Sequence, residues 1–219
     1  MLKSLTVIMG PRWGQGCQGG QPLWGGEPSR ARPFAQKIPQ SVGLLQPKRP
    51  ASVKLTRPMP IDRDEFRHTL ARWASGVSVV TARQGDRLVG MTVSAFCSVS
   101  LSPPLILICA SHDSETCAVI QATGQFAVNI LADHQRGVSQ RFSDPAVEGH
   151  RFETLAYDFG PMKLPLLAET AAALECQVTT SHVAGDHRIF IGEVLHTTRS
   201  DRAPLLFLKS GYGNFVAER

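Results

Sequence analysis

Apolar residues in the longer, later part of the chain first recur at helical spacing. Phe66, Leu70 and Trp73 lie four and three residues apart, which places them on one face of an α-helix. Asp62 precedes them, and aspartate is a favoured N-cap residue. The pattern predicts a short amphipathic helix that begins after Asp62 and ends near Gly76.

The apolar runs that follow are short, closely spaced and separated by turn residues. Gly-Asp pairs at 85–86 and 185–186 predict hairpin turns, and residues 115–122 are typical of one short helix. Many short β segments with two or three brief helices favour a β-barrel over a doubly wound sheet. The predicted strands are residues 77–81, 88–95, 105–109, 126–131, 174–183, 189–195 and 205–208.

Residues 1–58 have a different composition, with eight of the 19 Gly and eight of the 15 Pro in the chain. They carry no sustained apolar period, so burial cannot offset the entropy of ordering them, and we expect a disordered tail. The opening apolar run is too short for a signal peptide. The tail is either an Arg-containing targeting peptide or the result of a start assigned too early, with Met59 as the expected start of a domain over 59–219.

The formal net charge of +5 belongs to this tail. Residues 1–58 hold nine Lys and Arg against one acidic residue, a net charge of +8, and the remainder carries 14 basic against 17 acidic residues, a net charge of −3. The predicted domain therefore does not favour nucleic acid or an anionic membrane as a partner. The chain also contains no apolar run long enough for a membrane-spanning helix.

Cysteine and histidine spacing argues against a disulfide framework and against a bound metal. The five Cys form no C-x-x-C pair, and the seven His show no H-x-H or H-E-x-x-H spacing. We therefore expect no metal and a reducing cytoplasm. No G-x-S-x-G sequence marks a hydrolase nucleophile, and Cys97, Cys109 and Cys117 lie in or beside apolar runs, where small buried thiols are usual.

A segment at 92–102 alternates hydroxyl and apolar residues. Its even positions are mostly Ser or Thr, and its odd positions from 93 to 101 are apolar. If the segment is extended, it presents a neutral, hydrogen-bonding face that suits the polar rim of a planar heterocycle and phosphate oxygens. The alternative is a strand whose serines face only water.

Two further segments carry candidate chemistry. Residues 111–116, Ser-His-Asp-Ser-Glu-Thr, follow an apolar strand and open a helix, where free N–H groups could bind an anion or where Ser simply caps the helix. At 185–187 a turn explains Gly and Asp but not the His that follows at a strand entrance.

Several sequence blocks follow one another along the predicted domain: residues 72–81, 90–96, 98–104 and 126–131, Gly-Asp-His at 185–187 with 191–194, and 204–206. In this order they resemble the flavin reductase domain family, whose members are the reductase components of two-component flavin monooxygenases. The resemblance covers most of the predicted domain. Ser75 and Val93 depart conservatively from the family's usual residues, Thr and a small residue respectively.

The resemblance implies a mainly β protein, a six-stranded FMN-binding split β-barrel with a few short helices, assembled as a homodimer with flavin near the subunit interface. It implies an NAD(P)H:flavin oxidoreductase that transfers hydride from NADH or NADPH to FMN or FAD. The reduced flavin would then be supplied to a partner flavin-dependent monooxygenase. Since the cofactors carry this chemistry, the protein needs no triad or metal of its own.

The same resemblance assigns site residues. His187 would hold the nicotinamide and orient its hydride donor, with Asp186 beside it. The positions that match flavin contacts are Thr92, Val93, Ser94, Ala95, Ser98, Val99, Ser100, Leu101, Cys109, Ala110, Ser111, Thr116 and Phe142. Two alternatives remain on the same barrel: a flavin carrier or sensor without turnover, and a split-barrel flavin oxidase.

Overall fold

The computed structural model describes residues 61–216, so the predicted tail and the expected start at Met59 lie outside the described residues. Helix α1 (Arg63–Leu70) begins as predicted, with the Asp62 carboxylate accepting two backbone N–H groups of the first turn. The helix ends before Gly76, because Ser75–Gly76 form strand β1 and pair with β11 (Leu206–Leu208). Extended pairing satisfies backbone groups that a longer helix would have bonded internally.

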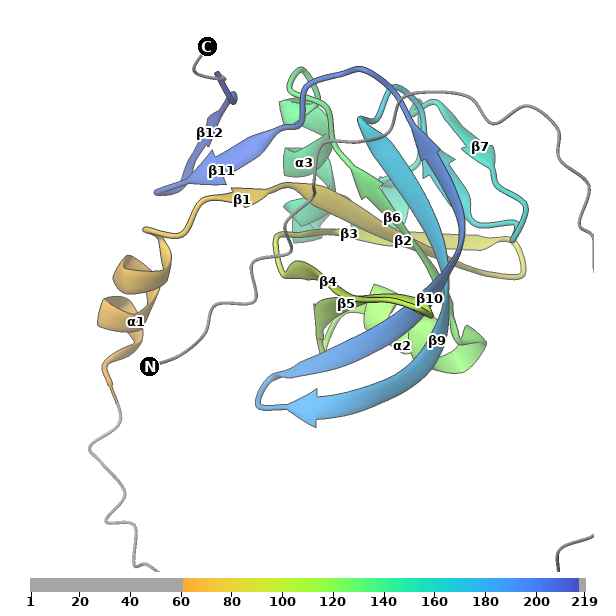
Figure 1. The fold of residues 1–219 in the computed structure, drawn as a ribbon, viewed down its shortest axis with the longest axis horizontal. Helices are drawn as coiled ribbons and strands as arrows, with labels where there is room; N and C mark the ends of the chain where they lie inside the picture. The colour runs from red at the N-terminus through yellow and green to blue at the C-terminus, as the bar shows by residue number, and fades with distance from the viewer. Residues whose placement is uncertain (1–60, 217–219) are drawn as a thin grey trace, which may run out of the picture. The chain divides into compact units, whose positions relative to one another are not determined.

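Seven antiparallel strands form the main sheet, and the chain is mainly β as predicted (Figure 1). The edge region of β3 also contacts β5, so the sheet curls into an incompletely closed barrel. The strands in spatial order are β3 (Arg87–Val93), β2 (Ser78–Gln84), β6 (Gln125–Ile130), β9 (Ala172–Ala184), β10 (His187–Arg199), β5 (Pro104–Ser111) and β4 (Phe96–Leu101).

The sheet has one strand more than the resemblance implied. The chain leaves the β ladder at Ser94 and Ala95 and re-enters it at Phe96, so two strands, β3 and β4, occupy residues 87–101. The smaller elements surround this sheet. They are α2 (Glu115–Thr123), α3 (Arg136–Ser143), a 3₁₀ helix (Pro145–His150), the β7 (Tyr157–Phe159) and β8 (Pro165–Leu167) pair, and β12 (Gly211–Gly213) beside β11.

The long β9–β10 hairpin turns at Gly185 and Asp186, which confirms the predicted turn. Each strand has 13 residues, and the end of β9 from Thr179 is mostly exposed. Figure 1 shows the hairpin extending past β4 and β5. Its tip therefore lies at the end of β5, which pairs with β10 from Ser111 onward.

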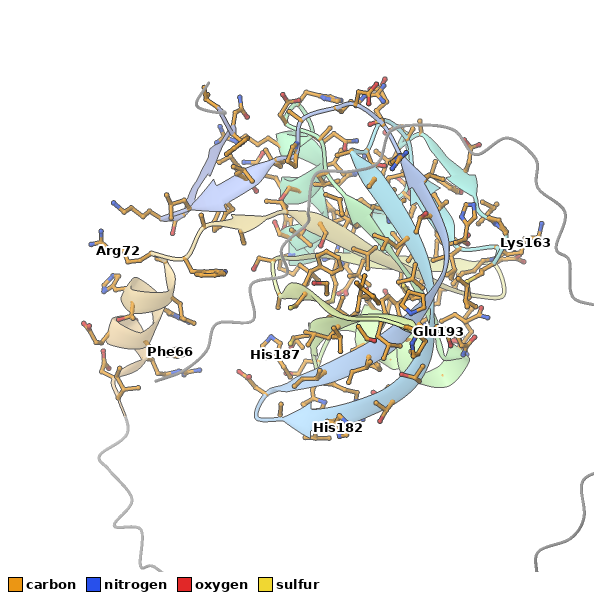
Figure 2. The ribbon with its side chains drawn as sticks, viewed as in Figure 1. Phe66, Arg72, Lys163, His182, His187 and Glu193 are labelled. Carbon is orange, nitrogen blue, oxygen red and sulfur yellow. The ribbon has the colours of Figure 1, made fainter. Side chains whose placement is uncertain are left out.

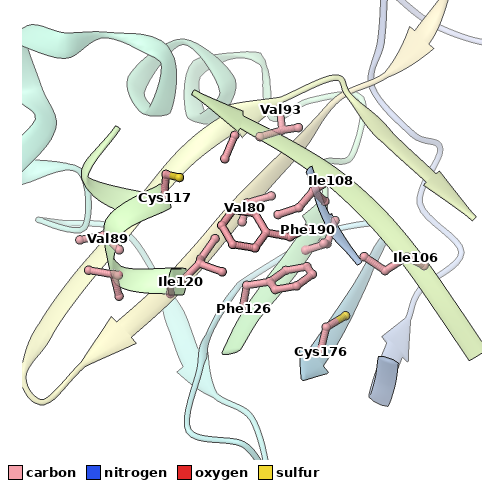
Figure 3. Packing of buried hydrophobic residues seen from close by; sticks show 14 residues of the cluster. Val80, Val89, Val93, Ile106, Ile108, Cys117, Ile120, Phe126, Cys176 and Phe190 are labelled. Atoms are coloured by element: carbon pink, nitrogen blue, oxygen red, sulfur yellow. The ribbon is translucent and has the colours of Figure 1, made fainter. Parts of the chain in front are cut away.

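The main core lies between the sheet and α2 (Figure 3). Phe126 of β6, Phe190 of β10 and Ile120 of α2 are essentially inaccessible to solvent. Cys117 belongs to this core, as expected for a small thiol beside apolar runs. Cys97 does not, and the expectation for it was wrong, because β4 is an edge strand that turns Cys97 outward.

A second, smaller core lies beneath α3 and includes Phe142, which is 1% exposed. The Phe142 ring packs edge-on against Phe152, with centroids 5.3 Å apart. It also covers Gly90 so closely that a Cβ there would lie 2.7 Å from the ring. Among residues 61–216, no helix is both long and apolar enough to cross a membrane.

Candidate functional site

Three surface hollows meet at Ser94. The α1 hollow, about 610 Å³, lies between α1, the segment from Ser94 into β4, and the β11–β12 turn. The β1 hollow, about 390 Å³, follows residues 73–78. The hydroxyl hollow, about 230 Å³, lies between the end of β3, α3 and the β11–β12 pair. Because Ser94 lines all three, they form one candidate site.

The break between β3 and β4 creates this meeting point. Ser94 and Ala95 lie outside both strands and are exposed, whereas Val93 before them is buried. The predicted single hydroxyl face over 92–102 was therefore wrong. Its alternation is interrupted at Ser94 and again by a register shift between Ser98 and Ser100.

Strand β4 presents its apolar positions outward. Val99 is 46% exposed and Leu101 89% exposed, while Phe96 packs against the main core. Ser98 pairs with Ile106, on the same side of the strand as Phe96. The predicted contacts over 98–101 thus lie on an edge strand beside the hollows, with the apolar face open to solvent.

The end of β5 connects the hollows to the hairpin tip. Cys109 N donates to Ala95 O over 3.1 Å, and two residues further on Ser111 pairs with His187. Ala110, between them, is fully buried and contributes no side-chain surface. Burial raises the pKa of the Cys109 thiol, so this thiol stays neutral at ordinary pH.

His187 lies at the start of β10, beside the hairpin turn (Figure 2). Its Nδ1 is 2.7 Å from Asp186 Oδ1, and the His187 side chain is 46% exposed. The hydrogen bond from His187 holds the pKa of the Asp186 carboxyl below its usual range, and the charge of His187 adds to this. This contact orients the imidazole and leaves Nε2 available to a ligand.

The start of α2 behaves as a capped helix terminus. Ser114 is the N-cap, and its hydroxyl accepts from Cys117 N over 3.1 Å and donates to Ser111 O over 2.8 Å. Thr116 is 1% exposed, and its hydroxyl has no hydrogen-bond partner within residues 61–216. Thr116 and Phe142 are both buried, so neither presents surface to a ligand in this chain.

Three hydroxyl-bearing residues of the hydroxyl hollow escaped the sequence analysis: Ser139, Ser143 and Tyr212. Ser139 of α3 and Tyr212 of β12 lie 2.9 Å apart through their hydroxyl oxygens. The Thr92 hydroxyl donates to Ser139 O over 2.7 Å, which ties α3 to the end of β3. These contacts span 47 and 73 residues of sequence, so no local spacing reveals them.

The expected neutral lining holds for part of the site only. The hydroxyl hollow is lined by Val77, Phe207 and five residues that carry hydroxyls: Thr92, Ser94, Ser139, Ser143 and Tyr212. The larger α1 hollow also includes Arg67 and Lys209 together with Phe66 and Trp73. Aromatic and cationic side chains at one hollow suit a planar ring that carries phosphate.

A model of the flavin reductase like domain matches residues 70–215. This chain belongs to that family. The match begins at the end of α1 and includes the β1 hollow, the hydroxyl hollow, the hairpin tip and the α1 hollow except for Phe66 and Arg67. It contains every site residue assigned from the sequence.

Named flavin reductases cover most of the same region. The NADH-dependent FMN reductase SmoA of Agrobacterium fabrum is 36% identical over 150 residues, which is 68% of this chain and 84% of that protein. The reductase component of 4-hydroxyphenylacetate 3-monooxygenase from Thermus thermophilus is 36% identical over 70% of this chain and 97% of its own.

A solved structure agrees in fold. The NADH:FAD oxidoreductase SgcE6 of Streptomyces globisporus, in complex with NAD and FAD fragments, superposes with a TM-score of 0.67 at 37% identity. The alignment covers 71% of this chain and 93% of that one. The flavin reductase family and the split-barrel fold expected from the sequence are confirmed.

Proposed function

We propose that this chain is an NAD(P)H:flavin oxidoreductase that supplies reduced flavin to a partner flavin-dependent monooxygenase. The observation that carries the proposal is the continuous connection from Ser94 and Ala95, through the Cys109–Ala95 hydrogen bond, to Ser111 and His187. The surface predicted to bind flavin and an imidazole suited to a second nucleotide thus lie along one strand end. Family membership and the names of the relatives support the same activity.

The protein's own contribution is orientation. When bound, flavin accepts the hydride and reduced nicotinamide donates it, so the protein has to align the two and restrict their motion. Ser94 and Ala95 provide exposed hydroxyl and backbone groups. His187, oriented by Asp186, would hold the nicotinamide nucleotide through Nε2.

The flavin and nicotinamide preferences are narrower proposals. Relatives include an NADH-dependent FMN reductase and an NADH-dependent FAD reductase, which supports NADH as the donor and leaves both flavins as candidates. The α1 hollow, which Arg67 and Lys209 line, is large enough to hold parts of a flavin nucleotide beyond the flavin ring. The partner monooxygenase is a separate chain that accepts the reduced flavin.

We also propose that the chain forms a homodimer. Helix α1 buries none of its residues, and Leu70 at its end and Trp73 in the turn after it are 54% and 79% exposed. The apolar positions Val99 and Leu101 of β4 are exposed as well. Exposed apolar surface of this kind is typical of a protein interface, and a second copy would cover it beside the candidate site.

The test uses the full chain freed of flavin, with oxidation of NADH and NADPH followed as FMN, FAD or riboflavin is added. We expect turnover that requires added flavin. His187→Ala should raise the KM for NADH at least tenfold and change the flavin KM by less than twofold, because the imidazole binds only the nicotinamide side. His182→Ala, on the same hairpin and exposed, is the matched control and should behave as wild type.

Failure has a distinct signature. If flavin binds but neither NADH nor NADPH is oxidised with any of the three flavins, the barrel serves as a carrier, a sensor or an oxidase, and the proposed function is wrong. If His187→Ala weakens flavin instead of NADH, the assignment of His187 to the nicotinamide is wrong while the activity stands.

A further inference from the structure

Two sides of the hydroxyl hollow come from separate elements of the fold. Thr92, in β3, and Ser94, directly after it, form the β3 wall. Ser139 and Ser143 of α3 form the α3 wall. Strand β3 lies at one end of the seven-stranded sheet and has a sheet neighbour on one side only. The separation of the two walls therefore depends on how α3 is fastened to β3.

One buried side chain fastens them. Arg151 follows the 3₁₀ helix and is 7% exposed. Its Nη1 donates to Gly90 O over 2.7 Å, and its Nη2 donates to Asp144 O over 3.0 Å. Gly90 lies two residues before Thr92 in β3, and Asp144 directly follows Ser143. A single guanidinium thus bridges the backbone beside the β3 wall and the backbone beside the α3 wall.

Packing alone does not explain an arginine at this position. The buried Nε of Arg151 has no hydrogen-bond partner among residues 61–216, and the Glu148 carboxylate is 3.7 Å from Nη1 and 41% exposed. A well-packed apolar side chain in place of a buried ion is often neutral for stability. What arginine adds is a planar fork of donors that reaches two carbonyls at once. Asp144 is the C-cap of α3, where the helix dipole also favours a cation.

Two other contacts join α3 to β3, and neither reaches the end of α3. The Phe142 ring covers Gly90, where a Cβ would lie 2.7 Å from the ring, but apolar contact has little directional preference. The Thr92 hydroxyl donates to Ser139 O over 2.7 Å and ties only the middle of the helix. The hydrogen bonds of Arg151 are directional and hold the end of α3 that carries Ser143.

We propose that Arg151 is a positioning residue that holds the β3 wall and the α3 wall at the separation that flavin binding requires. It acts through the Gly90 and Asp144 carbonyls and lines none of the three hollows of the candidate site. The inference rests on the proposed function for the identity of the ligand. It adds a residue that contacts no ligand and to which the sequence analysis assigned no role.

The experiment measures dissociation constants of FMN and riboflavin for the full chain by quenching of flavin fluorescence, without NADH. The variants are Arg151→Met, which removes the donors at similar length, and Arg151→Lys, which keeps the charge but not the fork. Glu148→Gln removes the partly exposed carboxylate beside Arg151 and leaves both carbonyl bonds in place. Arg199→Met, at the exposed end of β10, is the matched control for the loss of an arginine.

We expect Arg151→Met to raise both flavin dissociation constants about 3- to 30-fold, the range for substitutions that act on a site without touching its ligand. Arg151→Lys should give intermediate values, because an ammonium group bonds one carbonyl well but not both. Glu148→Gln and Arg199→Met should match wild type. The KM for NADH at saturating flavin should change less than twofold in every variant, since His187 lies on the β9–β10 hairpin and not on β3 or α3.

Thermal unfolding of each variant separates positioning from folding. If Arg151→Met unfolds at a lower temperature but binds flavin as wild type does, Arg151 supports the fold only and the inference is wrong. If flavin binding and the KM for NADH weaken by the same factor, the effect is not confined to the hydroxyl hollow, and the inference is wrong as well. Should Arg151→Met fail to fold, wild-type flavin affinity in Arg151→Lys would overturn the role of the fork.

Failure of the proposed function looks different. Because flavin binding is measured without NADH, a wild-type chain that binds flavin, weakened in the expected order by the Arg151 variants, supports the inference even if it oxidises neither NADH nor NADPH. Only the proposed reductase activity is then contradicted.

Discussion

Cys176 lies fully buried on β9, next to the equally buried Glu175. Burial, with a smaller contribution from the Glu175 carboxylate, raises the pKa of this thiol from 9.0 to about 12. The thiol is therefore a neutral packing group in the main core, where its Cβ lies close to Gly192. Its ionisation is coupled to folding rather than to the candidate site.

We expect the free energy of unfolding to fall as pH rises from about 9 toward 12. In that window the unfolded chain releases the Cys176 proton while the native chain retains it, at a cost of at most about 4 kcal/mol. Urea unfolding between pH 8 and 10 should show a smaller fall for Cys176→Ala than for wild type. Cys97→Ala, which removes an exposed thiol, should keep the wild-type slope, and equal slopes in all three proteins would contradict this coupling.

Strand β10 passes directly over the core at Gly192. A Cβ at this position would lie 2.7 Å from Phe126 Cζ and 3.0 Å from Cys176 Cβ. The register with β9 also shifts between Ile191 and Gly192, where Thr179 is an extra residue on β9, and this bulge bends β9 beside the close contact. This close approach sets the path of β10, and with it the position of the hairpin tip that carries His187.

Gly192→Ala should therefore destabilise the protein by about 1–3 kcal/mol, because the new methyl group overpacks a full core. Thermal unfolding measures the change. Gly149→Ala is the matched control, since a Cβ there meets no atom within 4 Å. A Gly192→Ala protein with wild-type stability would mean that the core yields at this strand and that β10 is not fixed by packing.

At the scale of the whole molecule, the exposed apolar surface on α1 and β4 gives the proposed homodimer its test. Leu70→Glu should weaken self-association about 10- to 100-fold, since it removes an apolar side chain worth roughly 1.5–3 kcal/mol when buried. Sedimentation velocity over a dilution series measures the shift. Lys163→Glu, an exposed substitution in the loop between β7 and β8, should leave it unchanged.

The measurement has a clear negative outcome. A wild-type chain that sediments as a monomer at the concentrations that support turnover would contradict the dimer. The α1 face would then need another partner. A dimer that Leu70→Glu does not weaken would instead move the interface away from α1.

Local patterns accounted for much of the fold. The Asp62 N-cap, the turn at 185–186 and the helix at 115–122 were predicted correctly, since each depends on residues adjacent in sequence. The length of α1 was predicted incorrectly. The residues expected to end the helix pair instead as β1 with β11, about 130 residues further along the chain. Phe142 matched a family position, yet only the packing of α3 on Gly90 reveals its burial.

By itself the sequence determined the barrel class, the family and the residues at its hairpin turn, because strand alternation, turn chemistry and sequence blocks are local properties. Only the tertiary structure decided which hydroxyls meet. Ser94 lies between strands β3 and β4, outside both, and Thr92, Ser139 and Tyr212 come together from three separate elements. The outward apolar face of β4 was likewise decided by its place at the edge of the sheet, since alternation along a strand defines two faces but not which one is buried.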